Sequence, residues 1–159
     1  DIEVDIFGNC DSRIKSKINN LSLNAIFNIK GYEDHKNTLV CINNADYLLI
    51  LLENEKGTDL IIPAKIFEYL SLKLPILAII PPGALSDLLD EYNIRWCDVN
   101  KSFKDIVEYI YYQLNSAPTV LNIDDNKLKK YTIEYLTDEY IKLFDETVKN
   151  VHKHNNTNI

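Results

Sequence analysis

The chain has few of the residues that build loops and cross-links. Its 159 residues include four glycines, five prolines, three cysteines and no methionine. So little glycine and proline argues against a low-complexity or disordered chain. Cys10, Cys41 and Cys97 are odd in number and lack the Cys-x-x-Cys spacing of zinc and redox sites. We therefore expect neither a disulfide framework nor a metal site, and interpret the cysteines as small buried side chains in a reducing compartment.

Positive charge and long apolar runs are also scarce. Lys and Arg number 17 against 24 Asp and Glu, a formal net charge of -7. Sequence-independent binding to phosphate backbones requires a basic surface, so we expect no nucleic-acid partner. No apolar run reaches the roughly 20 residues of a membrane-spanning helix, and no signal segment opens the chain. We therefore expect a soluble, cytoplasmic protein.

What is present is a globular composition, with 46% apolar and 26% charged residues. We expect a single domain over residues 1–159 with one core. Short apolar runs alternate with stretches of helical period, a pattern typical of an α/β fold with a parallel sheet. The expected strands are 2–7, 25–29, 47–52, 75–80 and 94–99; the expected helices are 12–20, 35–44, 64–72, 84–92 and 102–115.

The C-terminal part has a different pattern. Residues 116–126 are expected to form an irregular link. From Thr132 onward, apolar side chains recur at steps of three and four residues as far as Val151, which predicts one long amphipathic helix. Residues 152–159 have no such period, and we expect them to form a flexible tail.

The ends of the first two predicted strands offer candidate ligand contacts. In an open parallel sheet, ligands bind beyond the carboxyl ends of the strands, where helix N-termini present free N–H groups. Gly8 and Asn9 follow the first strand, and Gly31 and Tyr32 follow the second. Gly8 would let a diphosphate approach the backbone, Gly31 can take a positive φ, and Tyr32 could offer a ring face or a hydroxyl to a bound base. The alternative is that both are plain strand-to-helix turns.

The end of the third strand offers a stronger candidate. It opens the longest irregular insertion, "LLENEKGTDLIIPAK", and Pro63 suits the first turn of the next helix. The N–H groups of Ala64 and Lys65 are then expected to lack helical partners. Lys65 and Glu68 share a helix face, where they could hold a phosphate and ribose hydroxyls. The alternative is a surface ion pair of small energetic value.

The same residues carry a resemblance to a known family. "IPAKIFEYLSLKLPILAI" resembles the signature of GT-B glycosyltransferases of the family 4 type, in which a Pro-x-Lys-x-x-Glu-Tyr-Leu helix start precedes a Pro-Ile-Leu strand. "VDIFG", "FNIKGYEDHKNTLVCINNADYLLI" and "KYTIEYLTDEYIKLFDE" are similar to flanking segments of that family. The likeness covers residues 1 to about 148. It implies a Rossmann-like three-layer domain, the donor-binding half of a GT-B fold.

The resemblance also implies roles for individual residues. Glu68 would bind the ribose hydroxyls of a nucleotide-sugar, and the segment from Pro63 through Ala64 to Lys65 would hold its diphosphate. Gly8, with Asn9 beside it, would line the same crevice, and Gly31 and Tyr32 would lie near the base. The candidate nucleotide-sugar-binding residues are thus Gly8, Asn9, Gly31, Tyr32, Asp59, Pro63, Ala64, Lys65 and Glu68.

The sequence also departs from the family pattern. Many members carry a second glutamate at the position of Leu60, where this chain has Asp59 next to it, so recognition of the sugar is unassigned. The strand, helix and diphosphate-binding Arg and Lys that usually come first are missing, as is the N-terminal acceptor domain. We therefore interpret the chain as a fragment, inactive by itself. Any membrane association of the whole enzyme, at the inner face, would use the missing part.

The resulting hypothesis is the donor-binding domain of a hexosyltransferase-type enzyme of polysaccharide or glycoconjugate biosynthesis. Its partners would be a nucleotide diphosphate sugar, as substrate, and the acceptor domain; no metal cofactor is expected, and the resemblance implies a retaining reaction. One alternative is a non-catalytic binding or assembly subunit that uses the long C-terminal helix. Another is a receiver-like signalling domain, for which Asp5 and Asp11 are too isolated. His35 is interpreted as a surface residue.

Overall fold

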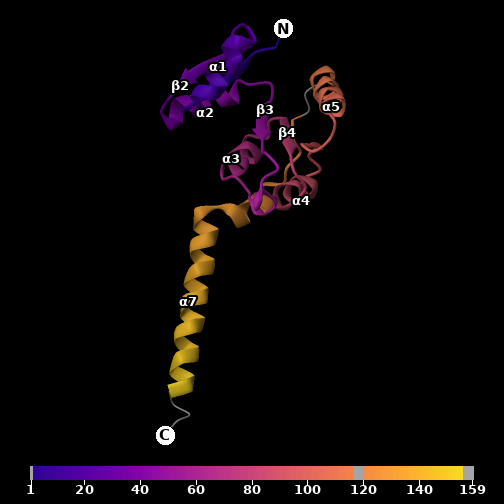
Figure 1. Ribbon diagram of the computed structural model, residues 1–159. Coiled ribbons are helices and arrows are strands. Elements are labelled where there is room, and N and C mark those ends of the chain that lie inside the picture. The colour runs from indigo at the N-terminus through magenta and orange to yellow at the C-terminus, as the bar shows by residue number, and fades with distance from the viewer. Residues whose placement is uncertain (1, 117–119, 156–159) are drawn as a thin grey trace. The chain divides into compact units, whose positions relative to one another are not determined.

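The computed structural model describes residues 2–116 and 120–155, and the chain divides into two compact units (Figure 1). Unit 1 comprises Asp1–Ala45 and unit 2 comprises Asp46–Ile159. Both are built from alternating strands and helices. Each unit is described by itself below.

Unit 1 is a two-stranded parallel sheet with two helices. Its elements in chain order are β1 (Val4–Phe7), α1 (Ser12–Asn20), β2 (Phe27–Gly31) and α2 (His35–Asn43). β1 pairs with β2 in parallel, and the register slips by one residue between Ile6 and Phe7. Ile18 on α1 is the single apolar side chain that is buried among the described residues of this unit. Unit 1 therefore has a very small core.

Unit 2 contains a three-stranded parallel sheet in the order β3-β4-β5. Its elements are β3 (Leu48–Leu51), the 3-10 turn η1 (Thr58–Leu60), α3 (Lys65–Leu72), β4 (Ile76–Ile80), α4 (Ala84–Glu91), β5 (Trp96–Asp98) and α5 (Phe103–Asn115). Each consecutive pair of strands is joined through a helix, as parallel pairing requires. β4 is the central strand and is almost fully buried, which explains its uninterrupted apolar sequence.

The core of unit 2 fills both faces of this sheet. On one face, Ile79 and Cys97 pack with Tyr109 of α5. Successive strand residues point to opposite faces, so Ile76, Ala78 and Ile80 face the other side. Right-handed crossovers place α3 and α4 on that second side. These two helices contribute the buried residues Ile66, Leu70, Leu85, Leu88 and Leu89.

The chain closes with α6 (Asp125–Leu128), the 3-10 turn η2 (Lys129–Tyr131) and α7 (Ile133–Asn155). The segment before α6 attaches to the end of α3: the Leu121 N–H donates to the Lys73 carbonyl at 2.8 Å, and Lys73 Nζ lies 2.7 Å from Asp125 Oδ1. The rings of Phe67 and Tyr131 lie 4.4 Å apart, centre to centre. α3 therefore anchors the segment that leads into the last helix.

The α/β class and the parallel pairing confirm the prediction, but the arrangement of the strands does not match it. One parallel sheet was expected, whereas the described strands form two separate sheets, β1-β2 and β3-β4-β5. Periodicity identifies a strand without saying which of its edges is paired, so this division was not readable from the pattern.

The expected element boundaries hold to within about two residues for most elements. α6 and η2 lie within or just after the link that was expected to be irregular. α7 continues to Asn155, so it includes the first part of the expected tail, and residues 156–159 lie outside the described residues. The expectation of a single domain stays a prediction.

Candidate functional site

In unit 1, the parallel pairing brings together the ends of the first two strands. The Gly8 N–H donates to the Gly31 carbonyl at 2.6 Å. Both glycines have positive φ, +97° and +77°, and a Cβ built on either would meet open space. Their backbone conformation therefore favours glycine, and the space beside them is free. Asn9 is exposed, and Tyr32 is 85% exposed. These four predicted residues thus share one edge of the small sheet.

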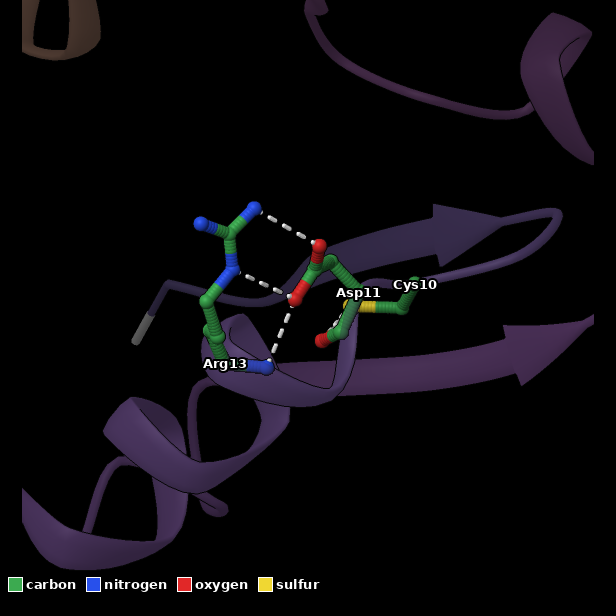
Figure 2. A network of polar contacts seen from close by, with 3 residues as sticks. All are labelled: Cys10, Asp11 and Arg13. Atoms are coloured by element: carbon green, nitrogen blue, oxygen red, sulfur yellow. Dashed lines mark hydrogen bonds and ion pairs between the residues drawn. The ribbon is translucent and has the colours of Figure 1, made fainter.

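The first turn of α1 begins at the same edge and carries a charged pair (Figure 2). Asp11 caps the helix by accepting from the Arg13 N–H at 2.7 Å. Aspartate is one of the residues preferred at the N-cap of a helix. The Arg13 guanidinium also binds the Asp11 carboxylate through Nε at 3.1 Å and through a terminal nitrogen at 3.0 Å. These bonds lower the pKa of Asp11 below its ordinary value, so Asp11 is held in its charged form.

Arg13 is a candidate site residue that the sequence analysis did not consider. Its side chain is 87% exposed, and it lies in the first turn of the helix that follows Gly8. A cation at a helix N-terminus opposes the helix dipole, so its placement there has no benefit for the helix by itself. That mismatch, visible in the sequence, was the signal that could have found it.

In unit 2, the start of α3 has the character expected of an anion site. Ala64 is the N-cap residue and provides no side-chain cap. The first backbone bonds run from Ile66 to the Pro63 carbonyl and from Phe67 to the Ala64 carbonyl. Within the described part of the chain, neither Ala64 nor Lys65 donates its N–H to a backbone carbonyl in these loop and cap bonds. Two N–H groups are therefore available at this end of the helix.

The side chains of Lys65 and Glu68 are both exposed. The opposite side of α3 is anchored by Ile66 and Leu70, which are fully buried. At about 100° per residue, Glu68 lies diametrically opposite this buried pair. Across the described residues no ion pair joins Lys65 to Glu68, so the alternative of a mutual surface salt bridge does not describe them. Both groups are free to meet a ligand.

The long loop before α3 is held against the start of α4. A Cβ on Gly83 would overlap the Asp59 carbonyl oxygen and lie 2.7 Å from the Asp59 Cα. The backbones of η1 and Gly83 therefore lie too close together for any residue with a Cβ at position 83. Asn54 Nδ2 donates to Asn100 Oδ1 at 2.7 Å, which ties the same loop to the end of β5. The exposed side chain of Asp59 is thus carried on a fixed backbone.

Two surface hollows lie elsewhere on the units. The first, on the outer side of α5, is lined by Val107, Glu108, Tyr111, Tyr112, Asn115 and Ser116. The second, in unit 1, is lined by Asp5, Phe7, Lys30, Glu33, Asn37, Val40 and Cys41. Neither is lined by any of the nine predicted site residues. The exposed polar groups at the start of α3 thus lie outside both hollows.

The described residues contain no group of three or more His, Cys, Asp and Glu side chains positioned to hold a metal ion. Asp5 forms an ion pair with Lys30 at 3.5 Å, and Asp11 forms one with Arg13. His35 is exposed at the start of α2. Over residues 2–116 and 120–155, no helix has the length and apolar character needed to cross a membrane.

Comparisons with known proteins identify no relative of this chain. Protein-family profiles, curated proteins and solved structures were each searched, and none matches the chain.

Proposed function

We propose that the chain is the donor-binding half of a GT-B glycosyltransferase, which would transfer a sugar from a nucleotide diphosphate sugar to an acceptor during polysaccharide or glycoconjugate synthesis. The acceptor domain would be a separate part of the enzyme. The observation that carries the proposal is the start of α3, where Lys65 and Glu68 are exposed, not paired with each other, and adjacent to two available N–H groups.

These groups suit two parts of one ligand. The N–H groups at the helix start and the Lys65 ammonium favour a diphosphate, because the helix N-terminus carries partial positive charge. The Glu68 carboxylate can accept hydrogen bonds from a pair of ribose hydroxyls. During sugar transfer, negative charge develops on the leaving diphosphate, and the same dipole and cation would stabilise it.

The strand ends of unit 1 support the proposal independently. Gly8 and Gly31 lie side by side with open space next to them, so a ligand could approach their backbone. The exposed ring of Tyr32 follows at once and is suited to stacking on a base.

The test is a titration of the chain with UDP, GDP and ADP, followed by amide NMR. We expect shifts at residues 63–68 at millimolar ligand, and loss of those shifts in Glu68→Ala. Glu108→Ala is the matched control, because Glu108 is also an exposed helical glutamate but lies on α5. No shift with any nucleotide, or equal shifts in the Glu68→Ala and wild-type chains, would refute the site.

A second variant separates the phosphate contact from the ribose contact. Lys65→Ala should weaken nucleoside diphosphate binding more than nucleoside binding, because the ammonium meets only the phosphates in this arrangement. The control is Lys104→Ala, an exposed lysine in the first turn of α5. An equal loss for diphosphate and nucleoside would mean that Lys65 does not contact the phosphates.

A further inference from the structure

Within unit 2, the long helix α7 has no cover over the part whose side chains are described. Every side chain from Ile133 to Lys149 is exposed, including eight large apolar ones. Figure 1 shows α7 as one continuous helix. An uncovered helix of this kind is stable only when a partner buries its apolar side, because propensity contributes little in water.

The apolar side chains form one stripe along α7. Steps of three and four residues place side chains on the same face of a helix. The stripe defined in this way comprises Ile133, Leu136, Tyr140, Ile141, Leu143, Phe144 and Val148, whose exposed fractions range from 44% to 80%. Tyr135 is 44% exposed. Its position in the helical turn places it on the opposite face. Such a continuous stripe is the usual form of a helix that lies in an apolar groove.

Carboxylates border this stripe on both sides. Glu134, Asp138 and Asp145 follow one edge at steps of four and seven residues, and Glu139 and Glu146 follow the other edge at a step of seven. The two lysines of the segment, Lys142 and Lys149, are seven residues apart on the face behind the stripe. Lys142 binds Glu139 at 2.8 Å. An exposed pair of this kind has small energetic value. Both edges facing a partner are therefore acidic.

We propose that the stripe of α7 docks into an apolar groove of a partner protein whose rims carry Lys and Arg. Apolar burial would supply the affinity, and the basic rims would set the orientation and raise the rate of association. This proposal does not depend on the donor-binding function, because it involves none of the nine candidate site residues.

The acidic edges argue against two other occupants of the stripe, a second copy of the chain and a membrane surface. In a pair of α7 helices from two copies of the chain, carboxylates would meet carboxylates along both edges, and like charges across an interface are unfavourable. An anionic membrane surface would repel the same edges, whereas helices that lie on such surfaces are rich in Lys and Arg. A basic-rimmed protein groove satisfies both the apolar stripe and its borders.

The probe is a synthetic peptide with the sequence of residues 132–149 in which every Asp and Glu is replaced by Lys and both lysines by Glu. It presents the same apolar stripe with basic edges. We expect the full chain to bind the labelled peptide in an anisotropy titration, with affinity that falls as salt rises. The unaltered peptide should not bind, and the chain should sediment as a monomer.

Two tyrosines provide a matched pair of variants. Tyr140→Ser removes a ring from the stripe and should weaken binding about tenfold, the loss typical of an aromatic anchor at an interface. Tyr135→Ser removes the same group from the opposite face and should leave the affinity unchanged. Both side chains are exposed, so neither variant should perturb folding.

Several outcomes would overturn the proposal. One is equal binding of the altered and unaltered peptides, and another is equal loss in the two tyrosine variants. Self-association that Tyr140→Ser abolishes would assign the stripe to a second copy of the chain. Binding to vesicles that contain phosphatidylserine, lost in the same variant, would assign it to a membrane. Absence of any peptide binding would mean that the stripe does not recognise a basic-edged partner.

Discussion

The two units use the same alternation of strand and helix but differ sharply in how much they bury. Unit 2 contains 16 of the 17 buried apolar side chains among the described residues, and unit 1 contains the other, Ile18. In β1 a charged residue, Asp5, interrupts the apolar run, whereas β4 is apolar throughout. Burial has to offset the entropy of ordering the chain. We therefore expect unit 2 to be the stable part and unit 1 to open first.

The largest effect should come from truncating the core of unit 2. Leu89 on α4 is fully buried. Leu89→Ala should therefore reduce the free energy of unfolding by about 3 kcal/mol through lost burial and a cavity. Leu21 in unit 1 is 66% exposed. Leu21→Ala should change the free energy of unfolding by only about 0.5 kcal/mol or less. Urea denaturation measures the free energy of unfolding of both variants. An equal loss in the two would contradict the expected difference in burial between the units.

A glycine from each unit tests whether crowding or backbone conformation matters more. Gly83→Ala would force a Cβ into the Asp59 backbone. Strain and overpacking add, so this change should cost about 3 kcal/mol. Gly8→Ala meets open space. Only the positive φ opposes it, and the cost should be about 1 kcal/mol. Thermal unfolding of the two variants shows which substitution costs more stability. A smaller loss of stability in Gly83→Ala than in Gly8→Ala would mean that η1 is not held against α4.

A tyrosine from each unit tests the value of a buried hydroxyl. The Tyr109 hydroxyl accepts from the Ala78 N–H at 3.2 Å and donates to the Arg95 carbonyl at 3.0 Å. Burial raises the pKa of this hydroxyl. Tyr109→Phe leaves both partners unsatisfied and should cost about 2 kcal/mol. Tyr32→Phe, at an 85% exposed position, should leave the unfolding free energy unchanged. A neutral Tyr109→Phe would show that water replaces the hydroxyl.

A cysteine from each unit compares the accessibility of the two units. The expectation that the cysteines are buried is wrong for Cys41 on α2, which is exposed and should react with a thiol reagent in the native state. Cys97 on β5 is buried, and burial raises the pKa of its thiol, so little thiolate is present. Its reaction should require opening of unit 2, and should therefore slow further at lower pH and accelerate in Leu89→Ala. Similar native rates at the two sites would indicate that Cys97 is not protected by the core of unit 2.

The smallest effect should be at the capped start of α1 in unit 1. Arg13 lowers the pKa of Asp11 below its ordinary value of 3.8. The stabilisation from this depressed pKa is present above that ordinary value and is lost as pH falls through the lower folded value. In an NMR titration, the midpoint of Asp11 should lie below 3.8 and rise toward it in Arg13→Ala. An unchanged midpoint in the variant would mean that the pair in Figure 2 is not formed in solution.

Much of the fold was predictable because it depends on local patterns. The uninterrupted apolar run at 75–80 identified the central strand, and the step of three and four residues from Thr132 identified α7. The short elements α6 and η2 were missed, because turns of three or four residues have no period to detect.

The candidate site was predictable in its parts and not in its assembly. Periodicity placed Lys65 and Glu68 on the exposed side of α3, and parallel pairing brought Gly8 next to Gly31. Arg13 was overlooked because Asp11, which it binds in the structure, was considered only as an isolated carboxylate. The close approach of Asp59 to Gly83 could not have been read from residues so far apart in the sequence, since it depends on how the loop folds over the sheet.

The sequence by itself determined which of the longer segments are strands and helices, that the strands run in parallel, and that α7 has one apolar side. Each of these follows from hydrogen bonds and side-chain periods within a short stretch of chain. Tertiary structure decided that the strands form two sheets, that the core gathers in unit 2, and that the α7 stripe is left exposed between Ile133 and Lys149. These depend on which surfaces meet, and a local pattern contains no information about its partner.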